Sequence, residues 1–201
     1  MDEITRGQIV SLSGALIIIY LILSILFGSL RVGAVALIPN LLPIAAFFGI
    51  LGLTGITLNL ATSLVATVAL GIAVDDSIHY FSRFNTESRR LANEELGVER
   101  ALSSIIRPVT YTTAALCAGF LALLVSDLRS QVAFGILAAA TLFIAWLVEL
   151  TLSPALSAGL RFVTLWEVLS VDLGSDPHKK IPLFKGLTQR QARIAALFGR
   201  I

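Results

Sequence analysis

The longest stretch of the chain without a charged residue runs from Val32 to Val74 and comprises 43 residues. As a single helix with a rise of roughly 1.5 Å per residue it would be about 65 Å long, about twice the roughly 30 Å of a bilayer's hydrocarbon core. The stretch must therefore fold back on itself. Glycine and small polar residues interrupt the aliphatic run at 54–59, so we expect a reversal there between two membrane-spanning helices.

Three more uncharged tracts are long enough to cross a membrane. Residues 7–30 form a tract of 24, and residues 108–126 and 130–148 form tracts of 19 each. Pro108 is placed to start its helix, and the apolar pattern of the last tract continues past Glu149. We therefore expect an all-α, polytopic membrane helix bundle with five spans, near 9–30, 33–53, 60–82, 108–126 and 130–160.

The composition agrees with a chain that is solvated by lipid. Hydrophobic residues make up 56% of it and charged residues 14%, against roughly 45–50% and 25% in soluble proteins. These values exclude a disordered chain, a disulfide scaffold and a water-soluble enzyme core. No basic stripe interleaved with aromatic residues is present despite the net charge of +2, so no nucleic-acid partner is expected.

Nothing in the sequence indicates soluble catalysis. There is no Walker A motif, and no pattern of ligand spacing surrounds His178. We therefore expect no enzyme activity, no catalytic residue, no cofactor and no metal. The one cysteine, Cys117, is most simply a packed small hydrophobic residue.

The distribution of Lys and Arg predicts the orientation. With the amino end outside, the outer segments hold Arg6 and Arg129, and the other 13 of the 15 basic residues lie inside. We therefore expect the N-terminus outside and the C-terminus in the cytoplasm. The cytoplasmic stretch 83–107 alternates basic and acidic residues, which is typical of a solvated loop, but its periodic apolar residues equally favour a helix on the membrane face.

The composition turns polar near the end of the chain. Residues 166–180 have the composition of a linker, and residues 181–201 contain a short amphipathic helix that could begin a soluble domain. A chain that begins beside a membrane helix, with a transmembrane bundle over 9–165, and ends in a soluble helix is expected to be a section of a larger protein.

The third span carries two adjacent carboxyl groups inside an otherwise apolar helix. At Asp75 and Asp76 each unpaired charge would cost roughly 2.5–3.5 kcal/mol on insertion scales. If the span ended at Val74 the pair would only mark a helix end, but about 15 apolar residues are fewer than the roughly 20 that a span requires. Two neighbouring carboxyls with little water around them cannot both ionise cheaply, so we expect this pair to load and release protons.

Four other polar residues are secondary candidates near the pair. His79 lies one turn from both aspartates, so it either relays protons or caps the helix end by bonding a backbone carbonyl. Thr112 and Thr113 either bond the carboxyls or bond their own backbone. Glu149 is either a second titrating group or a residue that reaches the membrane interface.

Residues 71–79, with the sequence GIAVDDSIH, resemble the fourth helix of a six-helix half in resistance-nodulation-division (RND) transporters. The likeness is strongest to the MMPL-type exporters of lipids and other hydrophobic molecules. It implies that the five spans are the second to sixth helices of one half and that Asp75 and Asp76 carry the protons of an antiport. The flanks of those helices are matched, in the same order, by residues 31–43, 58–62, 107–109 and 152–156.

The resemblance also implies a location and partners. The chain is expected in the inner (cytoplasmic) membrane, surrounded by the lipid bilayer, in an oligomer. Residues 1–8 would be the tail of an extracytoplasmic domain. Residues 32–81 contain no Lys or Arg, so the ionised aspartates need a cation or water from elsewhere, and the resemblance implies that the cation comes from the other transmembrane half.

Two other likenesses point to different functions. A sterol-sensing-like membrane module shares this helical arrangement and would bind or sense lipid without transport. Residues 181–187, followed by a helix, are similar to the opening of cyclic nucleotide-binding domains.

Overall fold

The computed structural model describes residues 2–91 and 93–158. Within these residues the chain forms long α-helices and one short 3₁₀ helix, with no strand. Five helices are long and apolar enough to cross a membrane, which confirms the predicted all-α bundle with five spans. In chain order the elements are α1 (Asp2–Leu26), α2 (Leu30–Thr54), α3 (Leu60–Leu91), α4 (Glu94–Leu121), η1 (Ala122–Val125) and α5 (Arg129–Ala158). The expected linker at 166–180 and helix at 181–201 lie outside the described residues.

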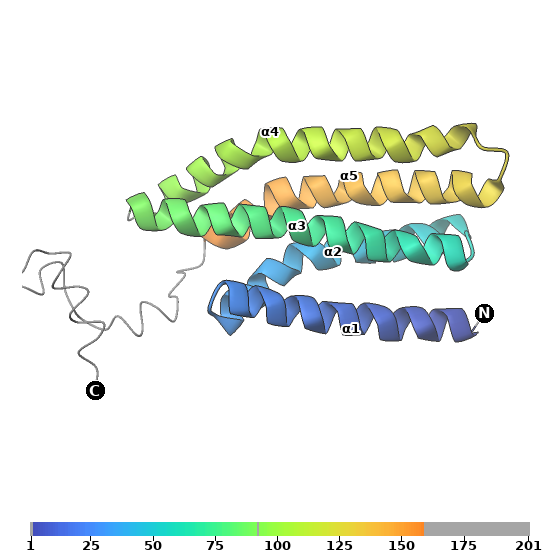
Figure 1. Cartoon of the computed structure of the whole chain (residues 1–201), viewed down its shortest axis with the longest axis horizontal. Helices are drawn as coiled ribbons and strands as arrows, with labels where there is room; N and C mark the ends of the chain where they lie inside the picture. Colours follow the sequence, from blue (N-terminus) through green and yellow to red (C-terminus); the bar gives the residue numbers. More distant parts are fainter. Residues whose placement is uncertain (1, 92, 159–201) are drawn as a thin grey trace, which may run out of the picture. The chain divides into compact units, whose positions relative to one another are not determined.

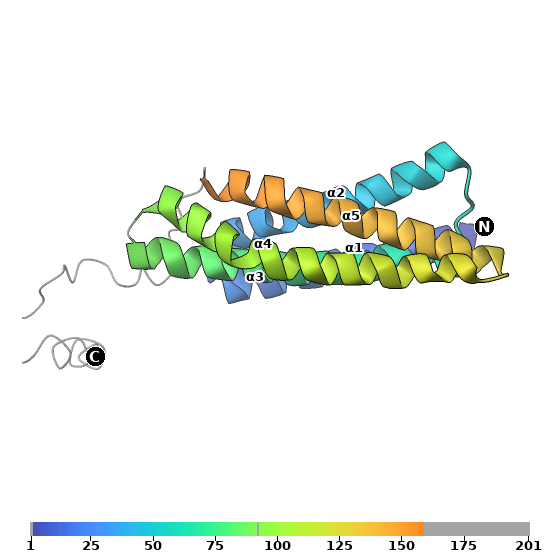
Figure 2. The same ribbon diagram turned by 90° about the horizontal axis from the view of Figure 1, so that it is seen from above.

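The helices run up and down beside one another (Figures 1 and 2). α5 packs against α2, α3 and α4, whereas α1 packs mainly against α2. The α1–α2 and α3–α4 turns lie at one end of the bundle, on the left in Figure 1, which we call the hairpin end. The α2–α3 and α4–α5 turns lie at the opposite end, so α3 runs from one end of the bundle to the other. Along this length α3 contacts α2, α4 and α5.

The turns follow from local chemistry. α2 ends at Thr54, and Gly55 has a φ of 67°, a left-handed conformation that glycine adopts without strain. The side chain of Asn59 then accepts a hydrogen bond from the backbone N–H of Thr62 at 3.0 Å and so caps the start of α3. The chain therefore reverses within 54–59, as the sequence predicts. The first span, in contrast, ends at Leu26 rather than near residue 30, because the chain turns there toward α2.

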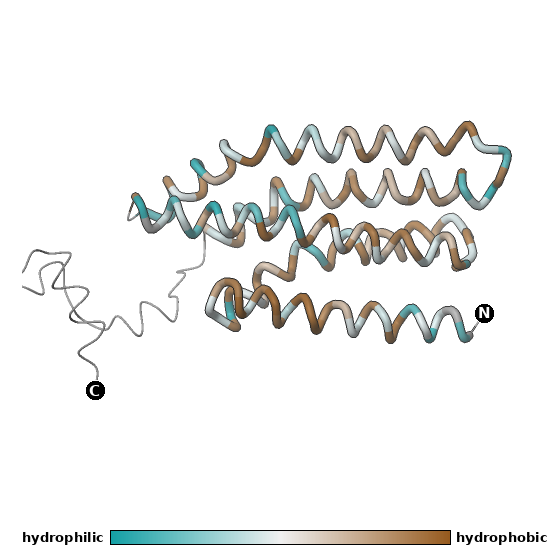
Figure 3. Tube along the Cα trace, viewed as in Figure 1, coloured by the Kyte–Doolittle hydropathy of each residue, from teal (hydrophilic) through white to brown (hydrophobic). Residues whose placement is uncertain are grey.

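The charged stretch 83–107 is a helical hairpin, which corrects both interpretations made from the sequence. α3 continues to Leu91 and α4 begins at Glu94, so the stretch is neither a solvated loop nor a separate helix on the membrane face. Figure 3 shows hydrophilic residues gathered on these helix ends, beyond the brown apolar stretches. The two spans therefore extend as helices well past their uncharged segments.

The charges themselves explain why this stretch stays helical. Arg83 and Glu87 are one turn apart and their side chains pair at 3.2 Å. The side chain of Asn93 caps α4 by accepting a hydrogen bond from the backbone N–H of Leu96 at 3.2 Å. Two glutamates in the first turn of α4 complement the positive end of the helix dipole.

Pro108 lies inside α4 and does not start it, which corrects the expectation from the sequence. The Asn93 cap starts the helix earlier, and proline is tolerated within a helix at the cost of one backbone hydrogen bond and a bend. Figures 1 and 2 show α4 changing direction in its first half.

Two buried apolar clusters hold the described helices together. One cluster, toward the hairpin end, includes Phe27, Tyr80 and Phe84. The other joins α2, α3 and α5 and includes Phe47 and Leu137. The polar residues at 75–79 lie on α3 between the α3 members of these two clusters.

Candidate functional site

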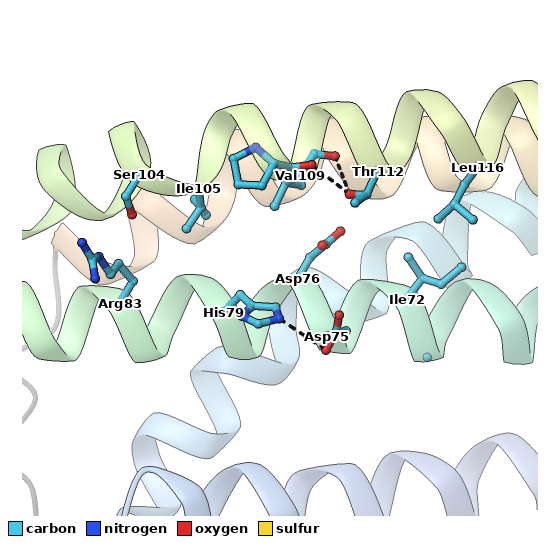
Figure 4. Close-up of a pocket in the computed structure, with 12 residues that line it drawn as sticks. Ile72, Asp75, Asp76, His79, Arg83, Ser104, Ile105, Val109, Thr112 and Leu116 are labelled. Carbon is cyan, nitrogen blue, oxygen red and sulfur yellow. Dashed lines mark hydrogen bonds and ion pairs between the residues drawn. The ribbon is translucent and has the colours of Figure 1, made fainter.

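A groove of about 720 Å³ lies between α3 and α4, and both aspartates line it (Figure 4). The α3 side supplies the ionisable groups of Asp75, Asp76, His79 and Arg83. The α4 side is mostly apolar, and its lining residues are Ser104, Ile105, Pro108, Val109, Thr112 and Leu116. The groove therefore places a charged wall opposite an apolar one.

The first aspartate is exposed and lies near the histidine. The side chains of Asp75 and His79 are 72% and 68% exposed, and Nε2 of the imidazole lies 3.7 Å from Oδ1 of the carboxylate. This is an ion-pair distance rather than a hydrogen bond. Because α3 continues twelve residues beyond His79, the alternative that His79 caps a helix end is wrong.

The second aspartate points a different way. Successive residues on a helix are about 100° apart, and Figure 4 shows the Asp76 side chain directed toward α4 while Asp75 turns toward His79. Asp76 is half-buried. The two carboxyls thus share one groove but have different surroundings.

A base on their own helix approaches the aspartates, because Nε2 of His79 lies 3.7 Å from Oδ1 of Asp75. His79 pairs with Asp75 whenever the imidazole is protonated. Arg83 lines the same groove, and its guanidinium pairs with Glu87. The stretch 32–81 contains no Lys or Arg, so a count of those two residue types overlooks the imidazole of His79.

The two threonines differ in their surroundings. The hydroxyl of Thr112 donates to the backbone carbonyls of Pro108 and Val109, at 3.1 and 3.0 Å, so it bonds its own helix even though it lines the groove. Thr113 is buried.

Glu149 lies inside the bundle and not at its edge. Its residue is 3% exposed, and its Oε2 accepts a hydrogen bond of 2.8 Å from the hydroxyl of Ser77. The alternative that this carboxyl reaches the membrane interface is therefore wrong for this structure. It lies on another side of α3 from the groove, because Ser77 is turned about 100° from Asp76.

Sequence reasoning missed Ser77, which bonds this carboxyl group directly, and Asn40, which bonds Ser77. Asn40 of α2 donates from its side-chain amide to the Ser77 hydroxyl at 3.1 Å. The missed signal was a fully polar amide in the middle of an uncharged span, where an unsatisfied polar group is costly. Tyr80 was missed as well, and its hydroxyl lies 2.6 Å from that of Ser157.

The groove brings titratable side chains together opposite apolar ones. Its carboxyls are reachable, one is beside an imidazole, and the opposite wall is apolar. Within 2–91 and 93–158, no group of three or more His, Cys, Asp or Glu side chains is placed to hold a metal ion.

Comparisons with known proteins identify relatives. The model of the MMPL family matches residues 1–172. A protein of Methanocaldococcus jannaschii described as a membrane protein is 32% identical over 157 residues, which are 78% of this chain and 40% of the relative. A protein of Streptomyces coelicolor with the same description is 29% identical over 162 residues, which are 77% of this chain and 22% of the relative.

These matches also set limits. The chain spans less than half the length of either curated relative. No solved structure matches it. The family match ends before residues 181–201, whose likeness to a cyclic nucleotide-binding domain gains no support from the comparisons and lies outside the described residues.

Proposed function

The chain belongs to the MMPL family of membrane proteins, and we propose that it is one transmembrane half of an RND-type exporter driven by the proton-motive force. Its cargo would be lipids or other hydrophobic molecules, and its role would be transport without enzyme activity. The observation that carries this proposal is the groove, because Asp75 and Asp76 both line it opposite the apolar wall of α4.

The groove supports proton coupling for two reasons. Adjacent carboxyls beside an imidazole can exchange a proton without moving the backbone. A proton that crosses the membrane field releases about 2.3 kcal/mol per 100 mV, so a few protons supply useful work. The apolar wall on α4 also suits a lipid chain, and this favours the second candidate, a sterol-sensing-like module that binds lipid without transport.

Loss of titration at the pair is the decisive test. In the complete transporter, Asp75→Asn combined with Asp76→Asn keeps the shape of both side chains and removes their proton binding. In vesicles under an imposed proton gradient, we expect the flux seen by an entrapped pH-sensitive dye to fall to that of protein-free vesicles. Full flux by the double variant would refute proton coupling at this pair.

A matched control excludes a general effect of removing acidic charge. Asp127 is exposed in the α4–α5 turn, far along the chain from the groove. Asp127→Asn is expected to leave the flux unchanged. Lipid binding by a wild-type protein that carries no proton flux would favour the sensing module instead.

We propose the second half as the necessary partner. The relatives are much longer than this chain, so a further transmembrane half and extracytoplasmic domains would complete the transporter. The groove side of α3 exposes Asp75 and His79, and a facing half would cover them.

We propose an inner-membrane orientation with the N-terminal end outside and the hairpin end in the cytoplasm. The support is the Lys and Arg bias, because Arg90 lies in the charged hairpin and Arg129 at the opposite end. In a Cys117→Ser background, an impermeant thiol reagent should label Arg129→Cys in intact cells and Arg90→Cys only after permeabilisation. Both positions are exposed, so equal labelling in intact cells would contradict this orientation.

A further inference from the structure

Four polar residues meet in the interior of the bundle, away from the groove, and we call them the buried polar cluster. Asn40 comes from α2, Ser77 from α3, and Glu149 and Ser153 from α5. Glu149 is 3% exposed and the other three are fully buried. A carboxyl group in such a place needs a compensating partner.

The hydrogen bonds of the cluster link the three helices through Ser77, whose hydroxyl also donates to Oδ1 of Asn40 at 3.4 Å. Asn40 donates through Nδ2 to the carbonyl of Ala36 at 2.9 Å and to the hydroxyl of Ser77 at 3.1 Å. Ser77 in turn donates to Oε2 of Glu149 at 2.8 Å. The remaining polar atoms, Oε1 of Glu149 and the hydroxyl of Ser153, are buried and form no hydrogen bond of full geometry, although the Ser153 hydroxyl lies near enough to interact with the Glu149 carboxyl group. They belong to residues one turn apart on α5, so they lie on the same face of the helix.

No positive charge compensates this carboxyl within the described helices. The ionisable groups that face it are Asp76 and Tyr80, both on α3. The basic residues of the neighbouring spans, Arg31 on α2 and Arg107 on α4, are exposed. A carboxylate buried without a cation takes up a proton instead of remaining ionised.

A proton fits the two remaining atoms better than a metal ion does. With a hydrogen on Oε1, Glu149 becomes a donor to the Ser153 oxygen and also becomes neutral, as a buried carboxyl group without a cation requires. A hard metal ion such as Mg²⁺ or Ca²⁺ collects about six or more oxygen ligands. Here Asn40 turns its N–H toward Ser77 and Ser77 donates its O–H to Glu149, so the cluster offers fewer oxygen ligands than such an ion collects.

We propose that Glu149 is a second proton-binding site, buried between α2, α3 and α5, with its proton held on Oε1 against Ser153. Ser77 directly follows Asp76 on α3, so the site joins α5 to the helix that carries the acidic pair. The proposal does not depend on export, because proton binding by Glu149 can be measured in the resting protein.

Infrared spectroscopy of the complete protein in lipid nanodiscs tests the site. At neutral pH we expect a C=O stretching band of a protonated carboxyl that persists when Asp75→Asn and Asp76→Asn are combined and is lost in Glu149→Gln. Full amplitude in Glu149→Gln would overturn the proposal. Loss of the band only in the aspartate variant would also overturn it, while leaving the proposed function intact.

Two serines on α5 provide a test variant and its matched control. This pair also tests the site if Glu149→Gln fails to fold. Ser153→Ala removes the expected acceptor and should shift the band to higher frequency. Ser157→Ala removes an equally buried hydroxyl that pairs with Tyr80 and should leave the band in place. Identical spectra for the two variants would contradict the site.

A cation exchange distinguishes the proton from an alkali metal. Replacing K⁺ in the buffer with Na⁺ at constant ionic strength should not change the band. A band that disappears in Na⁺ would assign the site to the metal ion and overturn the proton proposal.

Discussion

The two polar sites on α3 are built in opposite ways. On the groove side, Asp75 and His79 are mostly exposed, and Oδ1 of the carboxyl lies 3.7 Å from Nε2 of the imidazole. In the interior, Ser77 is fully buried and bonds Glu149 at 2.8 Å. The same functional group, a carboxyl, is therefore free to exchange protons in one place and fixed by its neighbours in the other.

This difference predicts which side of α3 contributes to the stability of the bundle and which side contributes to its activity. A buried hydrogen bond that loses one partner leaves the other unsatisfied, at a cost of about 1–3 kcal/mol. An exposed ion pair contributes about 0–1 kcal/mol. We therefore expect the interior cluster to hold the helices together and the groove residues to affect function with little effect on folding.

The largest effect on stability is expected for Ser77→Ala. This change removes the donor to Glu149 and the acceptor of Asn40 in a single step. We expect the free energy of unfolding to fall by about 1–3 kcal/mol, measured by denaturation in mixed micelles.

Ser82→Ala is the matched control for that variant, because Ser82 is an exposed serine on the same helix. It should change the free energy of unfolding by no more than about 0.5 kcal/mol. Equal losses in the two variants would mean that the cluster does not bind the helices together, and the contrast between the two sides of α3 would fail.

The sequence predicts the acidic pair of the first site, but of the second site it marks only Glu149, with two alternatives left open. The number of spans and the acidic pair depend on local hydropathy and on charges within one helix, so both can be read along the chain. The role of Glu149 depends on which side of α5 meets Ser77. α5 is apolar around most of its circumference, so its sequence does not mark an inner face.

The helix ends show the same limit. The sequence marks where charges begin, near residue 83, but not that α3 and α4 continue as helices beyond that point. The Asn93 cap and the pairing of Arg83 with Glu87 favour helix there, and charge runs alone do not distinguish this from a loop.

A smaller loss of stability is expected for Tyr80→Phe. This variant removes the hydroxyl that lies 2.6 Å from Ser157 but keeps the ring stacked on Phe84. Ser157 retains its bond to the carbonyl of Pro154 at 3.0 Å, so no donor is left without an acceptor. We expect a loss of about 0.5–1.5 kcal/mol in the free energy of unfolding.

Tyr20→Phe is the comparison variant for the tyrosine. The Tyr20 hydroxyl is 3.5 Å from the carbonyl of Leu30 and the contact is exposed. Its removal should cost less than about 0.5 kcal/mol. If both phenylalanine variants had the same stability as the wild type, the Tyr80 hydroxyl would not contribute to the interior packing.

Apart from the two control variants, the smallest effect on stability is expected for His79→Ala. The pair with Asp75 is exposed on both sides, so water and salt screen it and its loss should cost less than about 1 kcal/mol. This small difference between His79→Ala and the wild type should shrink further when the ionic strength of the micelle buffer rises from about 0.01 to about 1 M, because the Debye length falls from roughly 30 to roughly 3 Å. A loss above about 2 kcal/mol that salt does not change would mean that Asp75 and His79 lie in a dry interface. The groove side of α3 would then be built like the interior, and the acidic pair would need a different route for its protons.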